Sequence, residues 1–238
     1  MSATTREWRR LAEDDPLFAV AAWPDKSGRR WTAEDFYGVG ESDWSDFRAH
    51  WEDYVGTALG GTCLEVGCGA GRVTRALTET FSKVIAVDVS ERMLDLARAA
   101  CDAEFYLVDD TRLPFADESV DAVFTCHVLQ HLEDTGAVRE SVYELHRVLR
   151  PGGTAMAHLL LEEAPESALR KIRAEVRLRV VRGLHANRGA YSRVRRYRPV
   201  EVRTVFEGAG FADVELREFR VRSNYGVHPF WFGRRPVV

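Results

Sequence analysis

The sequence predicts one α/β domain of the Rossmann type, with a mostly parallel seven-stranded sheet, a C-terminal antiparallel hairpin and an N-terminal helical cap. Three observations support this class. Short apolar segments alternate with helical segments from residue 61 onward, a glycine-rich run at 67–71 ends the first of them, and 45% of the 238 residues are apolar. Strands that alternate with helices form a parallel sheet covered on both faces. A chain of this length can bury a full core, so disorder as its main state is excluded.

Residues 1–60 are expected to form the helical cap. Five of the six tryptophans lie before residue 55. Short helices are expected near 7–12 and 32–37, and a longer one over 42–59, where Ser42 is a suitable N-cap. The apolar side chains of the longer helix recur at helical spacing: Trp44, Phe47, Trp51 and Val55. Two interpretations of the aromatic residues are open, because they could pack in a core or form a lid over a small-molecule pocket.

Residues 61–161 are expected to form the core of the sheet. Strands are predicted at 62–66, 83–88, 104–108, 120–125 and 154–161. Helices are predicted at 72–81, at 90–100 and from the end of the fourth strand to 149. Ser90 is a suitable N-cap for the second of these helices. The sequence Pro151-Gly152-Gly153 predicts a turn before the fifth strand.

The last third of the chain is expected to hold a helical insertion over 162–200, followed by a helix and a β-hairpin over 201–238. The insertion is rich in arginine, since residues 161–203 contain twelve basic and five acidic residues. These charges form a solvated helix face, or else they bind an acidic ligand or the acidic N-terminal part of the chain. The two strands of the hairpin are predicted at 211–221 and 226–233.

The composition argues against several classes of protein. A formal net charge of −4 disfavours a dedicated nucleic-acid-binding protein, which needs basic residues to neutralise phosphates. No apolar run approaches the ~20 residues of a membrane span, and the charged N-terminus lacks a hydrophobic signal core. The four cysteines show neither a CxxC pair nor a metal-like spacing. We therefore expect a cytoplasmic protein without a membrane segment or a disulfide framework.

Glycines and acidic residues follow the predicted strands at one edge of the sheet. The run Gly67-Cys68-Gly69-Ala70-Gly71 lets the backbone approach a ligand closely. Asp88 ends the second strand, where a carboxylate can accept hydrogen bonds from a ribose diol. Asp109 and Asp110 end the third strand, where a carboxylate can accept from an exocyclic amine, and Glu65 can bridge to a ligand ammonium group or brace the loop. An acidic groove favours a ligand with a cationic end and disfavours NAD with its pyrophosphate.

Four segments between residues 65 and 153 form an ordered set of motifs. They are Glu-Val-Gly-Cys-Gly-Ala-Gly-Arg at 65–72, Val-Asp-Val-Ser-Glu-Arg-Met-Leu at 87–94, Leu-Pro-Phe-Ala-Asp-Glu-Ser-Val-Asp-Ala-Val at 113–123 and Val-Leu-Arg-Pro-Gly-Gly at 148–153. In this order they resemble class I S-adenosylmethionine-dependent methyltransferases, and the resemblance runs from about residue 61 to 233. It implies S-adenosyl-L-methionine as the cofactor of the 61–161 core and S-adenosyl-L-homocysteine as the product.

The resemblance also implies the cofactor contacts, position by position. The glycines would line the methionine part, Asp88 would hold the ribose hydroxyls, and Val89 and Met93 would pack near the adenine. Asp109 would accept from adenine N6 and Asp110 would add a backbone N–H, although the family more often has a small residue at that second position. Cys126 and His127 would lie near the methionine amino group and the transferred methyl. The full implied set is Glu65, Gly67, Cys68, Gly69, Gly71, Asp88, Val89, Met93, Asp109, Asp110, Cys126 and His127.

Three histidines are candidate catalytic bases. A methyl group on positive sulfur is already activated, so the protein mainly aligns the acceptor, and a base helps when that acceptor is a hydroxyl or a protonated amine. His127 and His131 are predicted to share one face of the helix after the fourth strand, and His158 lies at or just after the fifth strand. His131 could instead satisfy a buried backbone group. The H-x-x-x-H spacing could bind a metal, but no third ligand is evident nearby, so no metal site is predicted.

The sequence therefore predicts a methyltransferase that acts on an oxygen or nitrogen atom, or alternatively a carbon, of a small-molecule acceptor in a biosynthetic pathway. The acceptor would be acidic if the arginine-rich segment contacts it. Three other functions stay open. They are a protein that binds the cofactor without methyl transfer (a cyclase, a decarboxylase or a regulatory module), an RNA or protein methyltransferase that uses the arginines, and an NAD-dependent oxidoreductase. No oligomeric state is predicted.

Overall fold

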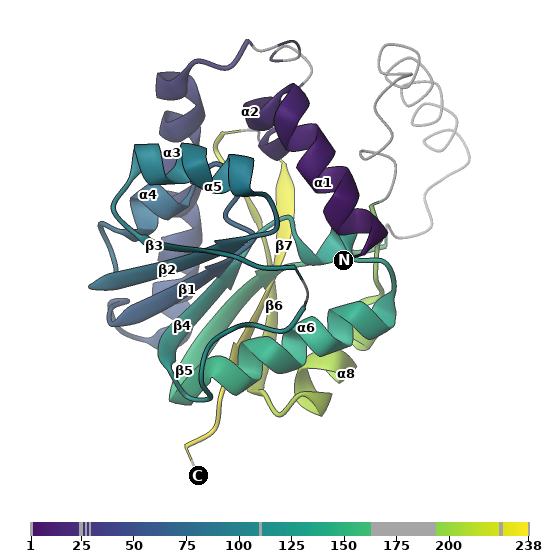
Figure 1. Cartoon of the computed structure of the whole chain (residues 1–238). Helices are drawn as coiled ribbons and strands as arrows, with labels where there is room; N and C mark the ends of the chain where they lie inside the picture. The colour runs from purple at the N-terminus through teal and green to yellow at the C-terminus, as the bar shows by residue number, and fades with distance from the viewer. Residues whose placement is uncertain are drawn as a thin grey trace, which may run out of the picture.

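The computed structural model describes residues 2–23, 26, 28, 30–109, 111–162, 194–223 and 226–237 (Figure 1). Its centre is a seven-stranded sheet with the order β3-β2-β1-β4-β5-β7-β6. The strands are β1 (Thr62–Val66), β2 (Lys83–Asp88), β3 (Glu104–Leu107), β4 (Val120–Thr125), β5 (Leu149–His158), β6 (Ala212–Arg220) and β7 (Val227–Arg234). The pairs from β3 to β5 are parallel, whereas β7 is antiparallel to β5 and β6. The predicted Rossmann-like class is confirmed.

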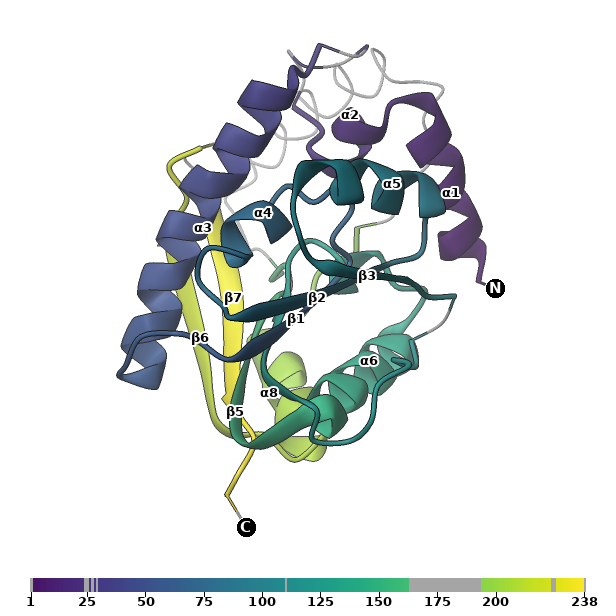
Figure 2. The ribbon, with the colours of Figure 1, turned by 60° about the vertical axis from the view of Figure 1, so that its left-hand side comes forward.

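Helices cover both faces of this sheet (Figures 1 and 2). One face carries α3 (Ala33–Val55), α4 (Thr74–Leu77) and α5 (Glu91–Ala100), and the other carries α6 (Thr135–Val148) and α8 (Pro199–Gly208). Successive side chains of a strand point to opposite faces. In β4, Phe124 therefore packs against Trp51 of α3, whereas Val123 packs with Val142 of α6. Both faces are apolar, which is why the strands read as continuous apolar runs.

The N-terminal cap consists of α1 (Ala3–Asp14), α2 (Pro16–Val20) and α3. A short helix near 32–37 and a separate, longer helix over 42–59 were expected, but α3 runs unbroken from Ala33 to Val55. The side chain of Thr32, not Ser42, caps it by accepting from the backbone N–H of Asp35. The glycine at position 40, which resembles a helix break, is required by packing, because a Cβ there would lie 1.8 Å from the carbonyl oxygen of Arg72.

The aromatic residues of the cap divide between the two expected roles. Trp44, Phe47 and Trp51 belong to a buried cluster on the α3 face of the sheet. Trp51 is fully buried, and its indole N–H donates to the hydroxyl of Thr154 at 3.0 Å. Trp8 of α1 instead lines a cavity at the edge of the sheet. The aromatic residues of α3 thus pack in the core, and Trp8 of α1 is placed beside the cavity, where the lid interpretation requires an aromatic side chain.

Several predicted boundaries were wrong. The helix expected over 72–81 is confined to α4, and β5 begins at Leu149 instead of after a turn at 151–153. The Pro-Gly-Gly segment joins the strand because Gly152 N–H donates to the carbonyl of Arg235 and Gly153 accepts from the N–H of Arg235, both at 2.8 Å. Residues 163–193 of the predicted helical insertion lie outside the described part of the chain. No helix within the described ranges is both long enough and apolar enough to cross a membrane.

Candidate active site

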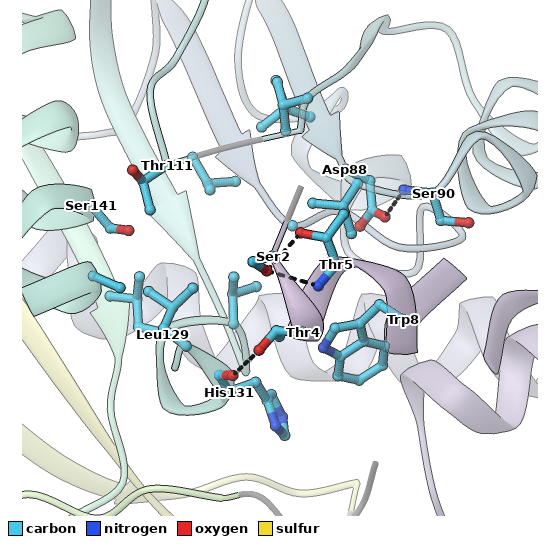
Figure 3. Close-up of a pocket in the computed structure, with 18 of the residues that line it drawn as sticks. Ser2, Thr4, Thr5, Trp8, Asp88, Ser90, Thr111, Leu129, His131 and Ser141 are labelled. Atoms are coloured by element: carbon cyan, nitrogen blue, oxygen red, sulfur yellow. Dashed lines mark hydrogen bonds between the residues drawn. The ribbon is translucent and has the colours of Figure 1, made fainter. Parts of the chain in front are cut away.

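A cavity of about 360 Å³ lies at the carboxyl ends of the parallel strands (Figure 3). Its walls come from the loops after β1, β2, β3 and β4, from the start of α5 and from the first turns of α1 and α6. Parallel strands place their carboxyl ends at one edge, which is where α/β proteins bind ligands. Eight predicted cofactor residues line the cavity: Gly67, Gly69, Asp88, Val89, Met93, Asp109, Cys126 and His127. The candidate base His131 and the α1 residues Thr5 and Trp8 line it as well.

The glycine loop after β1 is held against the end of β2. The backbone N–H groups of Gly67 and Cys68 donate to the carbonyl of Val87, at 2.8 and 3.0 Å. Gly67 has φ +77°, and a Cβ on it would lie 2.1 Å from a methyl carbon of Val128. Glycine is the only amino acid that permits both this backbone conformation and such a close approach, because it has no Cβ. The loop therefore brings bare backbone to the cavity wall, as a close-fitting ligand requires.

Asp88 anchors that loop from the end of β2. Its Oδ2 accepts from the N–H of Gly69 and its Oδ1 accepts from the N–H of Ser90, both at 2.9 Å (Figure 3). Burial raises the pKa of the carboxyl, and the backbone N–H groups act in the opposite direction. Each carboxylate oxygen has a further lone pair. Asp88 can therefore accept from two ligand hydroxyls while it still holds the loop.

Asp109, which is predicted to accept from adenine N6, already has a partner within the protein. Its carboxylate forms an ion pair with Arg9 of α1, and Arg9 Nε also donates to the carbonyl of Val89 at 2.7 Å. Asp109 thereby ties α1 to the rim of the cavity. No local pattern predicts this contact, since Arg9 lies 100 residues before its partner. Asp110, the predicted neighbour, lies outside the described residues.

Three predicted cofactor residues lie behind the described cavity wall. Glu65, Cys68 and Gly71 are buried, and none of them lines the cavity. Glu65 Oε2 accepts from the hydroxyl of Thr74 at 2.6 Å, which supports the bracing interpretation of this carboxyl. The pKa of Glu65 is raised to about 7, because the effect of burial outweighs the lowering effects of the Thr74 hydroxyl and Arg72.

The raised pKa of Glu65 predicts a pH-dependent stability. Between its ordinary pKa of 4.5 and about 7, the carboxyl of the unfolded chain ionises while that of the folded chain keeps its proton. The contribution of Glu65 to the stability of the cofactor-free protein should therefore fall as the pH rises through this window, by up to ~3 kcal/mol. Glu65→Gln, which can still accept from Thr74, should accordingly gain stability relative to the wild type as the pH rises, in denaturant unfolding at pH 5, 6, 7 and 8. The exposed control Glu79→Gln should show no such pH-dependent difference from the wild type, and its absence in Glu65→Gln would contradict the assignment.

The candidate bases do not share a helix face, so that prediction was wrong. The helix α6 begins only at Thr135, because the side chain of Asp134 caps it there. His127 lies in a bend with φ +60°, and His131 ends a short 3-10 helix, Leu129–His131. Both line the cavity, and the ring of His131 meets Trp8 edge-to-face with centroids 5.1 Å apart (Figure 3).

His158 occupies a different position. It is the last residue of β5, it is 0% exposed, and it lies behind the described cavity wall. Its ring instead packs against His127, with centroids 4.2 Å apart. A direct catalytic contact of His158 with an acceptor in this cavity is therefore not supported by its placement.

The open parallel sheet with an antiparallel end, the glycine loop after β1 and the carboxylate at the end of β2 define the class I S-adenosylmethionine-dependent methyltransferase fold. Residues 64–157 match a protein family described as "Methyltransferase domain". This part of the chain therefore resembles a methyltransferase domain of that family, as the motifs predicted.

Curated relatives and solved structures agree on this class. The chain is 37% identical over 100 residues to malonyl-[acyl-carrier protein] O-methyltransferase of Yersinia pestis, covering 42% of this chain and 36% of that protein. It is 33% identical over 113 residues to demethylmenaquinone methyltransferase of Tropheryma whipplei, covering 44% and 46%. Magnesium protoporphyrin IX methyltransferase of Synechocystis PCC 6803 with bound S-adenosylhomocysteine superposes with a TM-score of 0.61 at 17% identity, covering 98% and 95%. The chain spans less than half the length of these two curated relatives.

The cavity wall fits S-adenosylmethionine, the cofactor of this class. The glycine loop places bare backbone in the cavity wall, and the half-buried carboxylate of Asp88 offers acceptors to a ribose diol. Val89 and Met93 supply apolar surface for an adenine ring on the same side of the cavity. The contacts of the individual residues with the cofactor are predictions from the sequence.

Proposed function

We propose that this protein transfers the methyl group of S-adenosylmethionine to an oxygen or nitrogen atom of a small-molecule acceptor. The observation that carries the proposal is the cavity itself: loops of the cofactor edge form one wall, and Trp8 and Thr5 of α1 with His131 form another. A site closed by the protein's own first helix suits a small molecule better than a polymer. The aromatic ring of Trp8 offers a large contact area to such an acceptor.

The residues of the cavity divide the work. Asp88 holds the ribose, and the glycine loop accommodates the methionine part. The cofactor, when bound, supplies a methyl group that its positive sulfur has already activated. The protein then has to align the acceptor with that methyl and exclude water. His131 is positioned to take the proton that an acceptor hydroxyl or protonated amine must lose.

The relatives indicate the range of acceptors that this class serves. One is named for malonyl-[acyl-carrier protein] and another for demethylmenaquinone, so small-molecule biosynthesis is the setting we propose here too. An acidic acceptor is one member of that range. Of the arginine-rich segment, Arg195 lies near the cavity, since its guanidinium donates to the carbonyl of the wall residue Glu133 at 2.6 Å.

Two measurements test the proposal. Calorimetry should show binding of both S-adenosylmethionine and S-adenosylhomocysteine to the purified protein. Incubation with methyl-labelled S-adenosylmethionine and a metabolite extract should move the label onto a small molecule, identified by mass spectrometry. Absence of binding would refute the proposal. Binding with conversion of an extract metabolite that carries no label would instead favour a cyclase or decarboxylase.

A further inference from the structure

Three histidines from three strand ends converge beside the cavity. His127 follows β4, His158 ends β5 and His228 lies near the start of β7. Their ring centroids are 4.2 Å apart for His127 and His158, 5.4 Å for His127 and His228, and 5.5 Å for His158 and His228. One ring nitrogen from each residue lies within 4.8 Å of the other two.

The sheet register explains why residues so distant in sequence meet. In the parallel pair β4–β5, Thr125 is opposite Ala157, so both strands end together at the carboxyl edge. In the antiparallel pair β5–β7, His158 is opposite Phe230, so β7 begins at that same edge. His228 is two residues from Phe230 and points to the same face. The sequence spacing paired His127 with His131 and offered no third ligand. In the structure His127 instead lies with His158 of β5 and His228 of β7.

His158 shows that the cluster is built for something more than packing. Its side chain is completely buried, and neither ring nitrogen has a hydrogen-bond partner among the described residues. A buried polar atom without a partner costs about 1–3 kcal/mol. The ring is instead directed at two other imidazoles, and the aromatic ring of Phe230 packs beside it with centroids 5.1 Å apart. A ligand that accepts the electron pair of an imidazole nitrogen would remove this cost at one of the two ring nitrogens.

We propose that His127, His158 and His228 form a binding site for a divalent transition metal ion of the zinc type. Imidazole nitrogens suit zinc, copper, nickel and iron, whereas magnesium and calcium require oxygen ligands that this cluster does not supply. Zinc binds three histidines at about 2.0–2.1 Å in a tetrahedral arrangement that leaves a fourth position open. The three nitrogens lie within 4.8 Å of one another, and the rings would have to turn inward to reach that spacing.

The charges nearest the cluster are paired with each other. Arg72 and Asp43 both act electrostatically on His228, and they form a buried ion pair, which limits the positive charge near the cluster.

If the protein transfers methyl groups as proposed, the position of the metal site also bears on the choice of acceptor. His127 belongs both to the cluster and to the cavity wall. A metal ion held there borders the space for the acceptor and would bind it through an oxygen atom. A bound cation lowers the pKa of a coordinated hydroxyl, so the site favours acceptors that carry hydroxyl groups.

The test uses untagged, chelator-treated protein without cofactor, so that its outcome does not depend on methyl transfer. Wild-type protein should bind one equivalent of Zn²⁺ by calorimetry and elemental analysis, and Co²⁺ should give the visible absorption of a tetrahedral site. His158→Phe and His228→Asn should each weaken Zn²⁺ binding by at least ~100-fold, since loss of even an outer contact costs 10–100-fold.

Matched controls separate this site from adventitious binding. His50→Gln changes a histidine that stacks on Phe219 outside the cluster, and it should bind Zn²⁺ as the wild type does. The affinity of His158→Phe for S-adenosylhomocysteine checks its folding, and His228→Asn provides a second, less buried change. The proposal is overturned if wild-type protein binds no Zn²⁺, or if both cluster variants bind it with wild-type affinity.

Discussion

Asp88→Ala is expected to weaken the binding of S-adenosylmethionine by about 10- to 150-fold. This range corresponds to roughly 1.5–3 kcal/mol, the contribution of hydrogen bonds to a charged group. The carboxylate carries two duties, because it accepts from the N–H groups of Gly69 and Ser90 and has lone pairs left for the ribose hydroxyls. Calorimetry with S-adenosylmethionine and with S-adenosylhomocysteine measures the effect directly.

Two variants separate the ribose contact from the loop contact. Asp88→Asn keeps an oxygen that can accept one backbone N–H but loses the second acceptor, so we expect an intermediate loss of affinity. Asp102→Ala removes an exposed acidic residue after α5 and should leave affinity unchanged. Thermal unfolding of each variant checks that the fold is intact. Wild-type affinity in a folded Asp88→Ala protein would refute the ribose assignment.

The fold could be predicted because its signals are local. The strands β1 and β2 are short apolar runs, one followed by a glycine and the other ending in an acidic residue, and both features follow from burial on two faces and from the ligand edge. The errors occurred where packing determines an element. Gly40 allows α3 to pass close to the backbone at Arg72, and no local sequence pattern predicts this contact.

The site could be predicted only on its cofactor side. Gly67, Gly69 and Asp88 lie within or beside recognisable motifs, and the structure brings them together at the cavity. The acceptor side depends on contacts between distant segments, such as that of α1 with the loop after β4, and no local pattern encodes them. His127 has a positive φ, which an α-helix does not allow, so the helix expected from this point does not start here. No sequence pattern predicts that His228 of β7 lies beside His127.

Replacement of His131 is expected to have the largest effect on turnover. A general base typically contributes 10²–10⁴ in rate, so His131→Gln should lower kcat by about that factor if the acceptor must lose a proton. The affinity for S-adenosylmethionine should stay close to that of the wild type, because Asp88 and the glycine loop are untouched. The ring centroids of His131 and Trp8 are 5.1 Å apart, and Nε2 of His131 lies 3.3 Å from the amide nitrogen of Gln130. Replacement of His131 therefore also changes the packing of the cavity wall.

His131→Phe distinguishes proton transfer from packing. A phenyl ring keeps the edge-to-face contact with Trp8 but has no nitrogen, so it should lose as much activity as glutamine if His131 is the base. If the histidine only shapes the cavity, phenylalanine should retain most of kcat and change mainly KM for the acceptor. Measurement of kcat, KM and the cofactor Kd for both variants therefore decides between the two roles. Near-wild-type kcat in both would exclude His131 as the base and would indicate an acceptor that is already nucleophilic at neutral pH, because alignment with the activated methyl is then sufficient.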